Sequence, residues 1–174
     1  MKKLITSLLT AALLVSSVPA LAETDKPKAA EQIYYNVYSS DWPSLNYMYE
    51  SSADLCANFI DTLVEYDNYG ILQPCLAESW DISEDGCTYT FKLKEGLKWS
   101  DGSPLTAYDF EYSWKRVLDP DAGSETAYTL YGVIKNGYEC YLIRTVAVDD
   151  LPIRALDDTT FQVELKAPAS YFIT

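Results

Sequence analysis

Apolar and polar residues alternate most regularly between residues 74 and 118, where the pattern predicts strands followed by a helix. Every second residue of 88–93 is apolar, a period of two that is typical of an antiparallel strand with one buried face. Trp80 and Ile82 alternate in the same way before a Glu-Asp-Gly turn, which predicts a hairpin of two strands. A further short strand is expected at 97–99.

The residues after this hairpin predict a helix that lies across the sheet. Thr106 stands three residues before Asp109, which is the spacing of a capping box at a helix start. Asp119 and Pro120 end the pattern, because the residue before a proline is disfavoured in the helical region. We therefore expect a helix over 106–118. Its apolar stripe recurs at helical spacing and consists of Phe110, Trp114, Val117 and Leu118.

Weaker patterns elsewhere complete a mixed α+β fold. No repeat is present, and 138–151 is the least interpretable stretch. A helix start is also expected at Tyr171. The other predicted elements are a strand at 33–37, a helix from about 53 to 63, a hairpin turn at 67–70, a helix at 125–133, and a strand pair at 153–156 and 161–165.

The first residues have the three parts of a secretory signal peptide. Two lysines precede an apolar run at 4–18, and Ala-Leu-Ala at 20–22 fits a cleavage site. The apolar run is too short for a transmembrane anchor. We expect 1–22 to be the signal peptide and 23–31 to be a disordered lead-in. Because no cysteine lies near the cleavage site, an unlipidated periplasmic or extracellular product is expected.

Acidic residues strongly outnumber basic ones. The chain has 13 Lys and Arg against 26 Asp and Glu, no histidine, and a net charge of −13. Loss of Lys2 and Lys3 with the signal peptide leaves 11 − 26 = −15. A surface of this charge repels nucleic acid and anionic lipid, so we expect no nucleic-acid partner.

The absence of histidine also limits the chemistry available to an enzyme. It removes the usual general base and excludes Ser-His-Asp and Cys-His arrangements. A carboxylate pair, as in glycoside hydrolases, needs no histidine, and the doublets Asp149-Asp150 and Asp157-Asp158 could supply one. Both fall in predicted turns, where aspartate is favoured because it bonds to the local backbone. We expect no catalytic residue, with a secreted carboxylate-pair glycan hydrolase as the alternative.

The cysteines leave two interpretations open. Without histidine, a C-x-x-C pair or a regular spacing, no metal site and no cofactor are expected. An oxidising compartment permits disulfides, and four cysteines allow three pairings. Buried free thiols that act as small apolar side chains are the other interpretation. The four residues are Cys56, Cys75, Cys87 and Cys140.

Four short motifs follow one another between residues 74 and 110, and they carry a family resemblance. In this order they resemble the N-terminal part of the oligopeptide-binding proteins, the extracytoplasmic solute receptors of ABC peptide importers (solute-binding protein family 5). The resemblance extends weakly back to Ser44 and forward to Phe172. The motifs are Pro74-x-Leu76-Ala77-Glu78-Ser79-Trp80, Asp85-Gly86-x-x-Tyr89-Thr90-Phe91-x-Leu93, Gly96-x-Lys98-Trp99-Ser100-Asp101-Gly102 and Thr106-Ala107-x-Asp109-Phe110.

The resemblance implies the N-terminal part of a two-lobed periplasmic-binding-protein-like fold. On this basis 32–58 is the first segment of the large ligand-binding lobe, and 59–174 is the smaller inserted α+β lobe, truncated at its C-terminus. Such receptors close their lobes on a peptide by a hinge motion. A monomer then hands the peptide to the permease and ATPase of an ABC transporter. Receptors for nickel, haem or oligosaccharide share the architecture and are the alternatives, although the lack of histidine argues against a metal.

The same resemblance indicates ligand-binding residues in two places. Ser51 also stands three residues before Asp54, so a helix cap is its alternative role. A surface helix start is the alternative at the second place. The residues are Tyr49, Glu50, Ser51 and Ser52 in the loop before the helix at 53–63, and Glu125 and Tyr128 at the start of the helix at 125–133.

Overall fold

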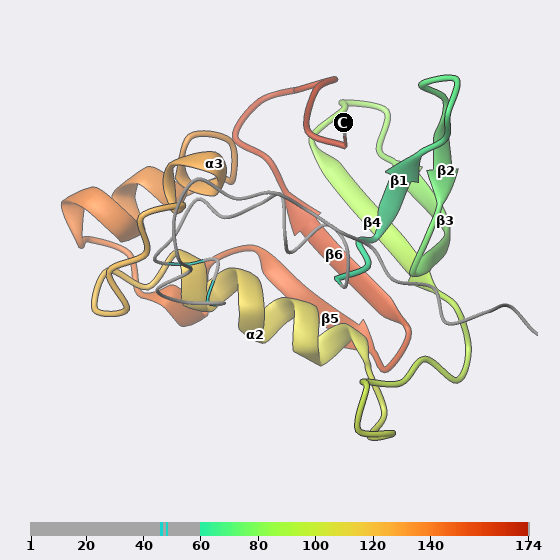
Figure 1. Cartoon of the computed structure of the whole chain (residues 1–174). Coiled ribbons are helices and arrows are strands. Elements are labelled where there is room, and N and C mark those ends of the chain that lie inside the picture. The colour runs from blue at the N-terminus through green and yellow to red at the C-terminus, as the bar shows by residue number, and fades with distance from the viewer. Residues whose placement is uncertain (1–45, 47, 49–59, 174) are drawn as a thin grey trace, which may run out of the picture. The chain divides into compact units, whose positions relative to one another are not determined.

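The computed structural model describes residues 46, 48 and 60–173, which all belong to one unit of the chain at 41–174. The elements are drawn in Figure 1. Its strands are β1 (Val64–Tyr66), β2 (Leu72–Pro74), β3 (Ala77–Ile82), β4 (Thr88–Leu93), β5 (Ile153–Asp157) and β6 (Thr160–Glu164). Its helices are α2 (Ala107–Val117) and α3 (Tyr128–Tyr131), with a π-helical turn at Glu139–Ile143 and a 3₁₀ turn at Val148–Asp150.

Four strands form an antiparallel sheet in the order β3-β4-β6-β5. In its central pair, Phe91 lies opposite Phe161 and both side chains are buried. The intervening residues turn to the other face, where the Gln162 amide donates a hydrogen bond to the Thr90 hydroxyl over 3.0 Å. The alternation predicted for 88–93 is therefore confirmed, since side chains of a strand point to opposite faces in turn.

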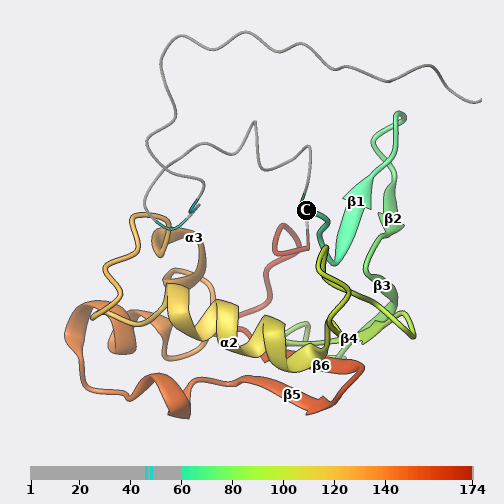
Figure 2. The same cartoon turned by 60° about the horizontal axis from the view of Figure 1, so that its bottom comes forward.

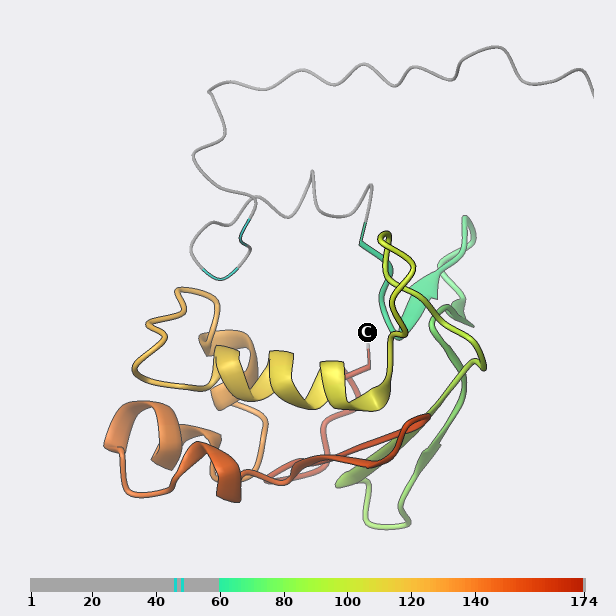
Figure 3. The same cartoon turned by 90° about the horizontal axis from the view of Figure 1, so that it is seen from below.

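Helix α2 covers the apolar face of this sheet and runs alongside β5 and β6 (Figures 2 and 3). The predicted capping box is present, and the backbone N–H of Thr106 donates to the Asp109 carboxylate over 2.7 Å. Farther along the helix, the Glu111 carboxylate accepts the backbone N–H of Ala155 in β5 over 2.7 Å. The helix ends at its C-cap, Leu118, so the helix predicted over 106–118 is confirmed.

Phe161 lies at the centre of the contact between helix and sheet. Its ring centroid is 6.2 Å from that of Phe91, 5.8 Å from that of Phe110 and 5.2 Å from that of Trp114. Helix and sheet therefore share one core. The other large, fully buried side chains of this core include Leu93, Leu118, Ile134, Leu151, Ile153 and Val163.

Strands β1 and β2 pair as a separate antiparallel ribbon next to β3 (Figure 2). The turn predicted at 67–70 joins them. The Asp67 carboxylate accepts the backbone N–H groups of Tyr69 and Ile71, each over 2.9 Å. Aspartate thus closes the turn through the local hydrogen bonds that its short side chain favours.

The helix predicted from about 53 to 63 is wrong at its end, because 60–63 is not helical. The Thr62 carbonyl accepts the N–H of Leu76 over 2.9 Å, and the Leu63 carbonyl accepts the N–H of Ala77 over 2.9 Å. These residues therefore pair with the stretch that leads into β3. The earlier part of this predicted helix, 53–59, lies outside the described residues.

Three further elements are shorter than predicted. The strand at 97–99 is reduced to a single bridge between Lys98 and Pro104. The helix at 125–133 is reduced to α3, and the N–H groups of Thr129 and Leu130 bond to carbonyls three residues earlier, as in a tighter turn. Residues 171–173 form a turn and no helix.

The predicted signal peptide at 1–22, the lead-in at 23–31 and the strand at 33–37 lie outside the described residues. Within the part of the chain that is described, no helix combines the length and apolar character needed to span a bilayer.

Candidate functional site

Two of the six predicted ligand-binding residues lie in the described part of the chain. Tyr128 is the first residue of α3 and Glu125 lies in the loop before it, and both are exposed, Tyr128 by 64%. The other four, Tyr49, Glu50, Ser51 and Ser52, lie outside the described residues. Met48, which directly precedes them in sequence, is described, and it contacts the loop that carries Glu125.

Two hydrogen bonds join Met48 to this loop. The backbone N–H of Glu125 donates to the Met48 carbonyl over 2.8 Å. The hydroxyl of Ser124 lies 3.4 Å from the same oxygen, at the limit of a hydrogen bond. Ser124 is 2% exposed, the one buried polar residue in the described part of the chain. Met48 is therefore joined to the loop that carries Glu125, one of the predicted ligand-binding residues.

The Met48 side chain is buried in a small apolar cluster of its own. It is 3% exposed and packs with Val117, from the last turn of α2, and Ala127, just before α3. Tyr131 and Tyr141 border the cluster. This second cluster lies beside the main core and is formed by segments far apart in sequence.

Tyr141 also binds this loop. Its hydroxyl donates to the Ser124 carbonyl over 2.6 Å, and its ring stacks on Tyr131 with centroids 5.6 Å apart. Tyr141 belongs to the π-helical turn, in the stretch whose sequence pattern is the least interpretable. Sequence reasoning missed Met48, Ser124 and Tyr141, because no periodicity links residues that meet only across the fold.

An open groove of about 540 Å³ runs along the outer face of α2. Its walls include Tyr108 and Tyr112, exposed by 52% and 66%, and Asp149 of the 3₁₀ turn. Lys115 also lines it, but its ammonium group is engaged by Glu111 over 2.7 Å. Both charges and tyrosines face the groove, so it offers no single ligand chemistry.

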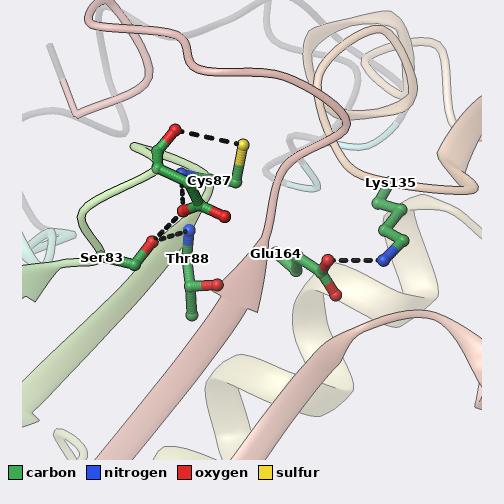
Figure 4. Close-up of polar contacts among 6 residues, drawn as sticks. Ser83, Cys87, Thr88, Lys135 and Glu164 are labelled. Atoms are coloured by element: carbon green, nitrogen blue, oxygen red, sulfur yellow. Dashed lines mark hydrogen bonds and ion pairs between the residues drawn. The ribbon is translucent and has the colours of Figure 1, made fainter.

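A second hollow, of about 470 Å³, lies where the β3–β4 turn meets the end of β6. Polar groups that line it bond to one another: Lys135 pairs with Glu164, as Figure 4 shows, and the Asp85 carboxylate accepts the N–H of Cys87 over 3.0 Å. In the described part of the chain, every buried side-chain nitrogen and oxygen has a hydrogen-bond partner. Neither hollow therefore contains a buried polar side-chain atom that lacks a hydrogen-bond partner and could bond to a ligand instead.

The described cysteines are free thiols, namely Cys75, Cys87 and Cys140. Partial burial raises the pKa of the Cys87 thiol, and the nearby Asp85 and Glu164 carboxylates raise it further. Burial likewise raises the pKa of Cys140, which is 1% exposed and packs in the main core. The small-apolar-residue interpretation is confirmed for Cys140, and neither thiol is activated as a nucleophile.

Asp157, in the acidic doublet at the β5–β6 turn, has a local structural role. The Asp157 carboxylate accepts the N–H of Thr159 and the hydroxyl of Thr160, each over 2.8 Å. These hydrogen bonds hold its pKa below the ordinary value of 3.8. A carboxyl group that is ionised in this way does not serve as a general acid near neutral pH. The turn role predicted for Asp157 is confirmed.

Comparison with known proteins identifies the family. A sequence profile described as "Bacterial extracellular solute-binding proteins, family 5 Middle" matches residues 72–174. The dipeptide-binding protein DppE of Bacillus subtilis is 44% identical over 102 residues, which cover 59% of this chain and 18% of that protein. The oligopeptide-binding protein AliB of Streptococcus pneumoniae is 37% identical over 182 residues, covering 99% of this chain and 28% of that protein.

Solved structures agree with these sequence matches. The periplasmic oligopeptide-binding protein OppAIV of Borrelia burgdorferi superposes with a TM-score of 0.68 at 35% identity. The match covers 75% of this chain and 27% of that one. This chain therefore spans less than a third of the length of the relatives that it matches. It belongs to family 5 of the bacterial extracellular solute-binding proteins.

Proposed function

We propose that this chain is part of an extracytoplasmic receptor that binds oligopeptides and delivers them to the permease and ATPase of an ABC transporter. The observation that carries the proposal is the family membership, together with relatives named for dipeptide and oligopeptide binding at 44% and 37% identity. The local chemistry supports binding over catalysis, since Asp157 is committed to a turn and the Cys87 and Cys140 thiols have raised pKa values.

The proposed mechanism is closure of two lobes on a peptide held in the cleft between them. The main chain of an extended peptide is bound through hydrogen bonds, which tolerates many side chains. We assign 32–58 to the first segment of the large lobe and 59–174 to the smaller lobe. The shared core of the sheet and α2 supports the second assignment, because it gives this lobe a rigid body. The proposed receptor is a monomer.

The proposed ligand-binding residues are Glu125 and Tyr128, together with Tyr49, Glu50, Ser51 and Ser52. The exposure of Glu125 and Tyr128 supports this role, because both side chains are available to a ligand. Removal of a signal peptide at 1–22 is part of the proposal and accounts for the route out of the cytoplasm.

A chimera tests the receptor function in a chain of full length. This chain replaces the matched stretch of AliB, and calorimetry measures the binding of a mixture of short peptides. We expect the dissociation constants to stay within about tenfold of those of AliB, a change of roughly 1.4 kcal/mol. A chimera that folds, with the circular dichroism and melting temperature of AliB, but binds no peptide contradicts the proposal.

Two variants of the chimera test the assigned residues. Tyr128→Ala is expected to weaken peptide binding, because it removes an exposed aromatic side chain from the proposed cleft. Tyr69→Ala is the matched control, since Tyr69 is 89% exposed in the turn between β1 and β2. If the two variants lose the same amount of peptide affinity, Tyr128 lies outside the ligand site.

The chain by itself is expected to bind short peptides weakly or not at all, because a cleft needs both of its lobes. A micromolar or tighter dissociation constant in a calorimetric titration would show that the matched part of a receptor suffices.

The enzyme alternative is tested by replacing Asp157 and Asp158 with Asn. A glycan hydrolase would lose turnover, whereas a receptor has none to lose.

A further inference from the structure

Met48 is a buried apolar residue that packs against segments far from it in sequence. It is one of two methionines in the chain, the other being Met1. It precedes the continuous described body at 60–173, yet its side chain is 3% exposed. Its side chain packs against Val117 and Ala127, and its carbonyl accepts the amide N–H of Glu125, all in the far part of that body.

The site that receives Met48, here called the Met48 seat, consists of Val117, Ser124, the Glu125 amide, Ala127 and Tyr141. It combines an apolar pocket for the side chain with a hydrogen-bond donor for the backbone. The Glu125 N–H donates to the Met48 carbonyl over 2.8 Å, and the N–H of Met48 donates to the Asn46 side-chain oxygen over 3.1 Å. The side chain and the backbone of Met48 are therefore both held, which fixes the position of the residue and the direction of its backbone.

The Met48 seat is braced by contacts that do not involve Met48. The Tyr141 hydroxyl donates to the Ser124 carbonyl over 2.6 Å, and the Tyr141 ring stacks on Tyr131. Cys140, in the same π-helical turn as Tyr141, is buried in the main core. The Val117 side of the seat is the last turn of α2, and Leu118 is buried in the same core. The seat is therefore part of the rigid body of sheet and α2.

We infer that Met48 is a positioning residue, a latch that fastens its own backbone to the smaller lobe. When the proposed receptor closes, Met48 moves with the smaller lobe, although its sequence position assigns it to the large one. The hinge then lies elsewhere in the chain. The functional part of this inference rests on the proposed receptor function, whereas the latch itself is a property of the chain alone.

Hydrogen exchange and methyl NMR on the whole chain test the latch. We expect the Glu125 amide to exchange slowly, and Met48→Ala to speed its exchange by about tenfold or more, because the carbonyl acceptor loses its anchor. Met48→Leu fills the pocket and should restore slow exchange to within about threefold. In wild type, the methyl resonance that disappears in Met48→Leu should be shifted upfield by the rings of Tyr131 and Tyr141.

The controls separate a latch from a general loss of stability. The Leu165 amide donates to the Cys87 carbonyl over 2.7 Å in the main core and should be unaffected by Met48→Ala. Leu151→Ala empties a fully buried position of that core and should not selectively expose Glu125. Equal acceleration at Glu125 and Leu165 in Met48→Ala, an unprotected Glu125 amide in wild type, or a Met48 methyl at its random-coil shift would each overturn the inference.

This test is independent of peptide binding. A chimera that fails to bind peptides overturns the receptor function and leaves the exchange result unchanged. Fast exchange at Glu125 overturns the latch and leaves peptide binding by the chimera as a separate result.

Discussion

The indole of Trp114 meets the ring of Phe161 edge-on, with centroids 5.2 Å apart and an interplanar angle of 74°. Edge-to-face pairs of this kind contribute beyond the apolar area that they bury. Phe161 in turn lies 6.2 Å from Phe91, the central residue of β4. One side chain therefore joins the helix and the hairpin that the sequence predicts as neighbours.

Phe161→Ala is expected to lower the free energy of unfolding by about 3–5 kcal/mol, because it leaves a cavity in a position that is 0% exposed. Urea denaturation followed by circular dichroism measures the change. Tyr69→Ala removes an aromatic side chain that is 89% exposed and should cost no more than about 0.5 kcal/mol. Similar costs for the two variants would mean that Phe161 does not organise the core.

Gly137→Ala is expected to destabilise the protein by about 1–3 kcal/mol through overpacking. A Cβ atom at this position would lie 2.9 Å from the Cα of Tyr131, a backbone atom that has no easy way to move. Gly132→Ala is the control, because Gly132 has a helical backbone conformation that alanine also adopts. The added Cβ atom would lie 3.6 Å from its nearest neighbour, an ordinary contact distance. Thermal melts of the two variants compare the effects directly, and a lower melting temperature for Gly132→Ala would reverse the expected order.

Glu111 should contribute stability that depends on pH. Burial alone would raise its pKa, but hydrogen bonds from the Ala155 amide and Lys115 outweigh it and hold the pKa below the ordinary value of 4.5. This contribution to stability is fully present at pH values above the pKa of Glu111 in the unfolded chain. It is lost as the pH falls through the lower pKa of Glu111 in the folded protein. Glu111→Gln should therefore cost about 1 kcal/mol at neutral pH.

The cost of Glu111→Gln should shrink at an acidic pH below the lowered folded pKa, where the wild-type carboxylate takes up a proton. Urea denaturation of both proteins at the two pH values provides the measurement. The exposed Glu95→Gln is the control and should leave stability unchanged. A cost that is the same at both pH values would show that the Glu111 charge contributes nothing.

The cysteines should differ in reactivity. Cys140 is 1% exposed and has a raised pKa, so alkylation by iodoacetamide should require unfolding. Cys87 is half-buried with a raised pKa, so its alkylation should be slow near neutral pH and accelerate as the pH rises. Peptide mapping by mass spectrometry measures each site, with urea-unfolded protein as the control. Equal labelling of Cys140 in folded and unfolded protein would contradict its burial.

The sequence by itself determined the local elements and, through its four motifs, the family. The period of two in 88–93, the capping box at Thr106 and Asp109, and the aspartate turn at Asp67 all depend on neighbours within a few residues. Their geometry follows from backbone preferences and side-chain spacing, which a sequence displays directly. The role of Asp157 in a turn was predictable for the same reason.

The tertiary structure decided what depends on contacts between distant residues. Helical spacing favoured a helix ending at Leu63, but the carbonyl of Leu63 instead accepts the N–H of Ala77. No local sequence pattern predicts that Met48 is buried beside Val117, or that the π-helical turn places Tyr141 against Ser124. A backbone group or side chain takes whichever partner the folded chain brings within reach, and sequence spacing does not record that distance.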